Sequence, residues 1–442
     1  MALAKIPVEL DTRAGAVTGR PTASVTARLW LSNADIQLVP LTVGPSNRPG
    51  GIFALSVCAT YNDMPPIQRN GKIVFANQLR GLAVLSVIIA HYLGVYWFGR
   101  DVVAQTIGAP LVEGGAPRIF PYVFFAPTFN YGPFGVAVFF LISGFVIPFS
   151  LEKLGGTKFI TARLFRIFPT YWAATLLTLA AIHLSTKYWG SKFYVTSDQV
   201  MWNLLLFHQQ MNIPSIDMVN WTLCIEVLFY VAALLMWPFI KRASALALVN
   251  FSLVVMALVT WWPESWDTIH VGATPVVLAF FKYQLMMVSF LFIGTLFNFR
   301  LNQRISGATL FGSAIAIFIA FLAAWPHTPL AGQFWATPVN YFYALIVFSF
   351  CFIVRDRFRQ LKIVDFFADI SYPLYLVHAV TGYAIIRVLM SHHFRYYQAA
   401  AVALTVAVGI AYVLHRVVEM PTANIWKLRK AAPGHNKPAE AA

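Results

Sequence analysis

The chain has 442 residues, of which 59% are apolar and only 11% are charged. Soluble globular domains are about one quarter charged, so this composition excludes an ordinary soluble fold and indicates an integral membrane protein. The net charge of +15 comes from short Lys and Arg clusters between apolar segments, which argues against a nucleic-acid-binding protein. The 3 cysteines lie far apart without metal-ligand spacing, so we expect neither a disulfide framework nor a metal site.

The N-terminal residues 1–68 contain no apolar run long enough to span a membrane. Their Thr, Ser, Gly and Pro content predicts a poorly ordered extension. Met64 stands directly before a short basic segment and the first apolar run, which raises the hypothesis that translation starts there. We expect residues 69–421 to form the transmembrane domain and residues 422–442 to form a short basic cytoplasmic tail.

Ten apolar segments then follow, each close to the roughly 20 residues that a membrane-spanning helix needs. They predict an all-α polytopic fold with about ten transmembrane helices. The segments are 79–98, 133–150, 168–186, 221–239, 244–262, 276–298, 307–325, 338–354, 369–390 and 398–417.

Basic residues concentrate in every second connection between these segments. Lys153, Arg163 and Arg166 lie in one such connection, and Arg355 to Lys362 lie in another. Cytoplasmic loops carry an excess of Lys and Arg, so this alternation predicts that both termini are cytoplasmic in a multi-pass protein of the cell (inner) membrane. Membrane lipid is then an expected partner.

The connection 187–220 contains one further apolar stretch, from Val200 to His208. It is too short to span the bilayer, so we expect a short interfacial or re-entrant helix near residues 200–210. Such a helix is placed to cover a cavity on the outer side.

Ionisable residues inside the predicted spans carry the most information about function, because buried charge in a membrane is costly. Five residues fit this description: Arg80, His91, Glu226, Lys282 and His378.

Arg80 and His91 share the first span and are eleven residues apart. Eleven steps along a helix place them on nearly the same face, separated by about 16 Å. This arrangement predicts an arginine at the cytoplasmic entrance and an imidazole deeper in the membrane, where histidine can act as a general base. The structural alternative is that Arg80 extends to the interface and His91 is a core histidine with satisfied hydrogen bonds.

Glu226 follows Trp221 near the start of a helix that enters from the outside. Counted along their helices, Glu226 and His91 fall in the same outer half of the membrane, so we expect the carboxylate to meet the imidazole and orient it. A purely structural His–Glu bridge between helices is the alternative.

Small and polar residues mark the second, third and ninth spans. Ser143-Gly144 at the middle of the second span is typical of close helix packing. Ser371, Tyr375 and His378 of the ninth span share one face at helical spacing. Arg163 and Arg166, which precede the third span, suit phosphate oxygens, although the topology alone also explains basic residues there.

Together these segments resemble the integral membrane acyltransferases usually called acyltransferase 3. The resemblance covers about residues 75–421 and rests on six motifs in the order of the family. They are Arg80-x10-His91, Gly135 to Ile147 with its Ser143-Gly144 core, Arg163-x-x-Arg166-Ile-x-Pro169-x-Tyr171, Trp221-Thr-Leu-x-x-Glu226, Ile370-Ser-Tyr-x-Leu-Tyr375-Leu-x-His378 and Glu419-x-Pro421.

The resemblance implies an O-acyltransferase that moves a short acyl group, acetyl first of all, from cytoplasmic acyl-CoA to a hydroxyl of a carbohydrate or a glycosylated molecule, as in polysaccharide modification. It implies that His91 is the essential histidine and Arg80 its paired arginine. We expect Arg80, Arg163 and Arg166 to bind the phosphates of acyl-CoA and His91 with Glu226 to activate the acceptor. Ser143, Tyr375 and His378 are candidate contacts for the oxyanion or the acceptor.

Two rival functions remain open at this stage. A proton-coupled secondary transporter would use His91, Glu226 and His378 as a proton relay. A non-catalytic accessory of glycan export would need no such chemistry. Incorporation of labelled acetyl from acetyl-CoA into membrane glycan separates the enzyme from both rivals.

Overall fold

A computed structural model describes residues 9–11, 26–28, 68–69, 72–117, 129–271 and 274–423. The chain divides into two units, Met1–Met64 and Pro65–Ala442. The predictions for the N-terminal extension and for the tail fall almost wholly outside the described residues. The described part of the first unit is an antiparallel pair of short strands, β1 (Glu9–Asp11) and β2 (Thr26–Arg28).

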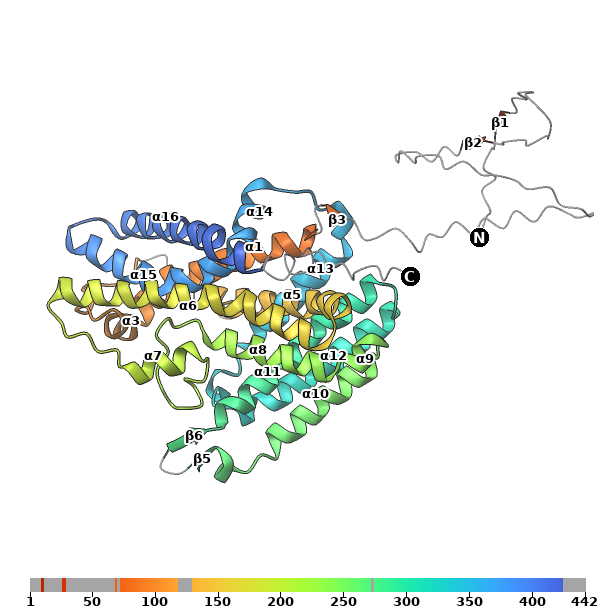
Figure 1. The fold of residues 1–442 in the computed structure, drawn as a ribbon, viewed down its shortest axis with the longest axis horizontal. Coiled ribbons are helices and arrows are strands. Elements are labelled where there is room, and N and C mark those ends of the chain that lie inside the picture. Colours follow the sequence, from red (N-terminus) through yellow and green to blue (C-terminus); the bar gives the residue numbers. More distant parts are fainter. Residues whose placement is uncertain are drawn as a thin grey trace, which may run out of the picture. The chain divides into compact units, whose positions relative to one another are not determined.

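The second unit is built from apolar helices, several of which run side by side (Figure 1). Its helices begin with α1 (Val74–Ile89), η2 (Ala90–Val95), α2 (Tyr96–Phe98), α3 (Arg100–Ile107), α5 (Tyr131–Leu154), α6 (Gly156–Trp189), α7 (Ser197–Leu204), α8 (Trp221–Leu235), α9 (Trp237–Lys241) and α10 (Ala245–Thr260). They continue with α11 (Ala279–Leu301), α12 (Gly307–Ala324), α13 (Pro338–Ile353), α14 (Lys362–Asp369), α15 (Ser371–Ser391), α16 (Tyr396–Leu414) and η7 (His415–Glu419).

Short elements complete the second unit. One strand pair, β3 (Gln68–Arg69) and β4 (Lys72–Ile73), precedes α1, and a second, β5 (Thr268–Val271) and β6 (Thr274–Val277), precedes α11. The β5–β6 pair was not expected from the sequence. Single 3-10 turns are η3 (Glu264–Trp266), η4 (Trp325–His327), η5 (Ala331–Gln333) and η6 (Arg355–Arg357).

Each of the ten predicted segments coincides with an apolar helix of the structure. Within the described residues, 7 helices are long and apolar enough to cross a membrane, and α8, α10 and α13 are shorter apolar helices. An all-α polytopic fold is therefore confirmed, while the count of ten spanning helices stays a prediction. The helix predicted near 200–210 lies slightly earlier, as α7, and Thr196 caps it by accepting a hydrogen bond from the Gln199 amide.

The basic connections meet at one end of the bundle. Arg304, after α11, forms an ion pair of 2.9 Å with Glu152 at the end of α5 and donates to the carbonyl of Lys241 at the end of α9. Gln78 at the start of α1 donates to the carbonyl of Arg359 between α13 and α14. We call this end of the molecule the basic end.

Two glycines bring α5 and α11 into close contact. A Cβ on Gly144 would lie 2.9 Å from the carbonyl carbon of Leu291, and one on Gly294 would lie 2.8 Å from the amide nitrogen of Phe145. The close approach lets Thr295 donate to the Gly144 carbonyl at 3.0 Å. The packing role predicted for Ser143-Gly144 is therefore confirmed, and interfaces of small residues are typical of membrane helices.

Replacing Gly294 by alanine is expected to destabilise the bundle by about 1–3 kcal/mol, because the new methyl group forces the two backbones apart. The measurement is the thermal unfolding midpoint of the purified protein in detergent. Gly312→Ala on α12 is the matched control, since a Cβ there meets nothing within 4 Å. Equal midpoints for the two variants would contradict the close-packing argument.

Candidate functional site

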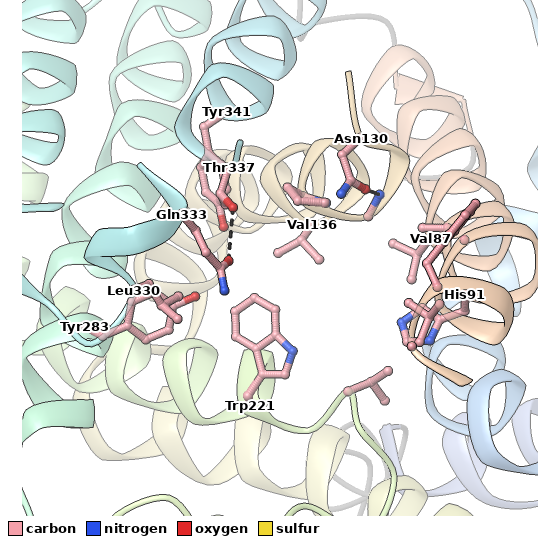
Figure 2. A pocket seen from close by; sticks show the side chains of 18 of the residues that line it. Val87, His91, Asn130, Val136, Trp221, Tyr283, Leu330, Gln333, Thr337 and Tyr341 are labelled. Atoms are coloured by element: carbon pink, nitrogen blue, oxygen red, sulfur yellow. Dashed lines mark hydrogen bonds between the residues drawn. The ribbon is translucent and has the colours of Figure 1, made fainter. Parts of the chain in front are cut away.

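Two cavities lie inside the second unit. The His91 cavity has a volume of about 560 Å³ and is lined by His91, Asn130, Gln209, Trp221, Gln333 and Tyr341 among others (Figure 2). The Arg80 cavity, of about 500 Å³, is lined by Arg80, Ser143, Arg166, Glu226, Tyr230 and Glu419 among others. Val136 of α5 and Tyr375 of α15 line both cavities, so the two spaces adjoin at these side chains.

His91 lies in a π-helical turn, η2, which continues α1. Such turns insert an extra residue per hydrogen-bonded ring and occur often at functional sites. The Nδ1 atom of His91 lies 2.6 Å from the hydroxyl of Tyr383 on α15. Because Nδ1 is engaged by Tyr383 and the ring lines the cavity, Nε2 is the nitrogen available to a bound molecule.

His378 packs directly against His91. The two rings meet edge to face with centroids 4.8 Å apart. Nδ1 of His378 lies 2.8 Å from the carbonyl oxygen of Tyr375 and 3.2 Å from that of Leu374, so this nitrogen carries the proton and donates it. His378 is fully buried, and its Nε2 atom has no hydrogen-bond partner among the described residues.

Packing of α1 against α15 sets the positions of both histidines. The hydroxyl of Tyr92, next to His91, donates to the carbonyl of His378 at 3.0 Å. Gly382 makes room for this tyrosine, because a Cβ at that position would lie 2.6 Å from the Cε1 atom of Tyr92. The helix pair is thus held together directly beside the two imidazoles.

The Arg80 cavity combines cations with carboxylates. Arg80 interacts electrostatically with Arg166 and Arg163, and with Glu226 and Glu419. Glu226 accepts hydrogen bonds from Tyr230 at 2.5 Å and from Ser143 at 3.4 Å. Glu419 forms a 2.7 Å bridge to His415 within η7. The predicted grouping of Arg80 with Arg166 is therefore seen in the lining of one cavity.

Arg163 does not line either cavity. Its guanidinium donates to Ser150 and lies 5.7 Å and 5.9 Å from the ring centroids of Phe159 and Tyr230. It belongs to α6, which starts at Gly156 and thus includes Arg163 and Arg166, which the sequence placed in a connection. Its charge still reaches the cavity, because it interacts with Glu226 and Arg166.

The expected meeting of Glu226 with His91 does not occur. The hydrogen-bond partners of Glu226 are Tyr230 and Ser143, and it lines the Arg80 cavity. His91 lines the other cavity and contacts Tyr383 and His378. The physical reason lies in the segment that precedes α8. Ile216, Asp217 and Asn220 are buried, so the helix begins inside the protein and not at its surface.

This buried segment is held by a dense set of hydrogen bonds. The side-chain amide of Asn220 donates to the side-chain carbonyl oxygen of Asn203 at 2.8 Å and to the hydroxyl of Tyr171 at 3.0 Å. The carboxylate of Asp217 accepts from the amides of Val219 and Asn220, while burial raises its pKa to about 6. The network fixes Trp221, which follows it directly, at the wall of the His91 cavity.

Tyr375 lies where the two cavities adjoin. Its hydroxyl is 2.9 Å from that of Thr222 and donates to the carbonyl of Val219 at 3.2 Å. Ser371 and Tyr375 line the Arg80 cavity, and His378 of the same helix contacts His91, so the predicted polar face of α15 follows the inner wall of the site. Lys282, the fifth ionisable residue within a predicted span, pairs with Asp267 at 2.5 Å.

Several site residues could not be recognised from the sequence. Tyr383, Asn130 and Gln333 carry no charge and resemble ordinary residues of a helix or loop. The π-turn at His91 has no sequence signal, because it depends on packing against α15. In the described part of the chain, no group of three or more His, Cys, Asp or Glu residues is arranged to hold a metal ion.

Fold and cavities together define a polytopic α-helical membrane protein with a buried imidazole in one cavity and an arginine–carboxylate cluster in the next. A family model of the acyltransferase 3 family, described as an acyltransferase domain, matches residues 73–416. The chain therefore belongs to this family, which supports an acyltransferase activity in the membrane. No curated protein and no solved structure matched the chain.

The Tyr383→Phe variant is expected to lower kcat of acyl transfer about 10- to 100-fold with little change in KM, because the His91 ring loses the group that fixes its orientation. Initial rates of the purified protein over a range of substrate concentrations provide the test. Tyr412→Phe on the outer surface of α16 is the control. A Tyr383→Phe enzyme with unchanged kcat would show that His91 needs no such partner.

Proposed function

We propose that the protein is an O-acyltransferase that moves a short acyl group, in the first instance acetyl, from acyl-CoA to a hydroxyl of a carbohydrate or glycosylated acceptor. The observation that carries this proposal is the pair of adjoining cavities. One offers arginines for a phosphorylated donor, and the other offers an imidazole for an acceptor hydroxyl. Membership of the acyltransferase 3 family supports the reaction class.

The donor enters the Arg80 cavity in this proposal. Phosphate oxygens of CoA bind Arg80 and Arg166, because guanidinium groups form strong charge-assisted hydrogen bonds with phosphate. Eleven residues separate Arg80 from His91, which corresponds to about 16 Å along the helix. The pantetheine arm spans a comparable length, so it can carry the thioester past Val136 and Tyr375 to the boundary of the His91 cavity.

The chemistry takes place at this boundary. Nε2 of His91 accepts the proton of the acceptor hydroxyl while the oxygen attacks the thioester carbonyl. The carbon–sulfur bond then breaks, the CoA thiolate leaves, and the imidazolium returns the proton to the sulfur. The hydroxyl oxygen of Tyr383 accepts a hydrogen bond from Nδ1–H of the ring and keeps the lone pair of Nε2 directed to the cavity. The hydroxyl of Tyr375 exchanges its bond to the Val219 carbonyl for one to the developing oxyanion in this proposal.

Orientation in the membrane completes the proposal. The basic end faces the cytoplasm, where acyl-CoA is available, and both termini lie on that side of the cell (inner) membrane. The His91 cavity then faces an acceptor that reaches it from the opposite side. A reporter enzyme fused to the C-terminus and found active outside the cell membrane would contradict this orientation.

A secondary transporter is less compatible with the structure. Its proton relay requires His91, Glu226 and His378 to communicate, but the partners of Glu226 are Tyr230 and Ser143 in the other cavity. Only the two histidines are in contact.

The decisive experiment is transfer of radiolabelled acetyl from acetyl-CoA in membranes that contain the protein. We expect CoA-dependent incorporation into a glycan or glycosylated fraction, with release of free CoA in equal amount. Membranes without the protein are the background control. Absence of both incorporation and CoA release would contradict the proposed function.

A further inference from the structure

The side-chain amides of the His91 cavity share one hydrogen-bonding pattern. Three amide side chains line it, and in each the carbonyl oxygen is already engaged by the protein. Oδ1 of Asn130 accepts from the Gly132 amide at 3.0 Å, Oε1 of Gln209 accepts from Gln284 at 2.9 Å, and Oε1 of Gln333 accepts from Thr337 at 3.3 Å.

The amino groups of these side chains are left as donors. Nδ2 of Asn130 and Nε2 of Gln209 and Gln333 have no hydrogen-bond partner among the described residues, and the same holds for the indole N–H of Trp221. Gln333 and Trp221 project into the cavity on the side across from His91 (Figure 2). The cavity therefore presents several N–H groups to whatever occupies it.

The His91 cavity contains few charged groups. Apart from His91, the described residues that line the cavity carry no ionisable group other than tyrosine hydroxyls. Six aromatic side chains form much of its wall: Phe98, Trp221, Phe280, Tyr283, Tyr341 and Tyr375. Among the described lining residues, an anionic group bound there would find no cation other than a protonated His91, which is costly away from water. Aromatic surface with a few fixed polar groups is typical of sites that bind a ring with its oxygens at defined positions.

We propose that the His91 cavity binds an uncharged glycosyl ring of the acceptor, with Trp221 against the ring and Asn130, Gln209 and Gln333 donating hydrogen bonds to its oxygens. This inference rests on the proposed acyltransferase function and deepens it. Oxygens that only accept hydrogen bonds are bound by the amides, whereas the one hydroxyl that donates its proton is directed to Nε2 of His91. Gln333 and Gln209 thus determine which hydroxyl is acylated.

The test uses the full-length protein in lipid nanodiscs, radiolabelled acetyl-CoA and two sets of acceptor probes. The first set contains the methyl glycosides of glucose, galactose and mannose, and the second contains the methyl glycosides of the corresponding uronic acids. We expect at least one neutral glycoside to be acetylated mainly at one position, with kcat/KM at least about tenfold higher than for its uronic acid. NMR spectra of the ester product identify the position.

Gln333→Met retains the size of the side chain but donates no hydrogen bond. We expect it to raise KM for the preferred glycoside about five- to tenfold and to distribute the ester over more than one hydroxyl. Gln105→Met on the exposed face of α3 is the matched control and is expected to behave as wild type. A merely structural role of Gln333 would lower activity without changing the position of the ester.

The outcomes separate this inference from the proposed function. Equal rates with neutral and uronic acid probes, or an unchanged KM and product in Gln333→Met, would overturn the assignment of the cavity while the acyltransferase function stands. Acetylation of other alcohols but of no glycoside would do the same. Failure of acetyl-CoA to transfer its acetyl group to any hydroxyl would overturn the proposed function and this inference with it.

Discussion

Replacing His91 by alanine is expected to lower kcat of acyl transfer by about 10²–10⁴-fold, to the limit of detection in a membrane assay, because the acceptor hydroxyl loses its general base. The side chain lines the cavity and holds one hydrogen bond to Tyr383, so its removal leaves the surrounding helices packed. Initial rates of acetyl incorporation, normalised to protein in the membrane, measure the effect.

Two further variants make the His91 prediction specific. His91→Gln retains a polar group near Tyr383 but cannot take up a proton, so it is expected to be as inactive as His91→Ala. His270→Ala on the exposed strand β5 is the matched control and should retain full activity. Wild-type turnover by His91→Ala, in protein that elutes as a folded species in detergent, would refute His91 as the base.

The Arg80→Gln variant is expected to raise KM for acetyl-CoA about 10- to 100-fold, which corresponds to loss of a charge-assisted hydrogen bond to a phosphate. kcat should change less, because His91 and the acceptor site lie in the other cavity. Arg80→Lys is expected to be intermediate, since it retains the charge without the planar group. Steady-state kinetics at saturating acceptor measure these values.

Comparison of acetyl-CoA with acetyl-dephospho-CoA tests the phosphate contact itself. If Arg80 binds the 3′-phosphate, wild type loses affinity for the shortened donor, whereas Arg80→Gln no longer distinguishes the two donors. Arg100→Gln is the control, because this arginine bonds to the carbonyl of Gly114 and lines neither cavity. An unchanged KM for acetyl-CoA in Arg80→Gln would show that the phosphates bind elsewhere.

The structure changes the role that the sequence assigned to Glu226. It does not orient His91; it balances the charge of Arg80 and accepts hydrogen bonds from Tyr230 and Ser143. Removing it would leave Glu419 as the other carboxylate that acts on the charge of Arg80, in a cavity that Asp369 also lines. Removal of Glu226 is therefore predicted to affect donor binding and the folding of the Arg80 cavity, and not the basicity of the His91 imidazole.

The sequence alone determined the membrane class, the position of each apolar helix and the family motifs that carry Arg80 and His91. These features are local, because a run of about 20 apolar residues or a fixed residue spacing can be recognised without knowing its neighbours. The close packing at Gly144 was predictable for the same reason, since small residues inside a span rarely serve another purpose.

Tertiary structure decided which side chains meet. Hydropathy gives the approximate depth of a residue in the membrane, but not the rotation of its helix or the identity of the adjacent helices. Counting along the helices did not give the partners of Glu226, because the segment around Asp217 is buried and α8 starts inside the bundle. Tyr383 and His378 became partners of His91 only through the packing of α1 against α15. Sequence therefore determined the membrane helices and the family, while helix packing decided that His91 and Arg80 serve two adjoining cavities.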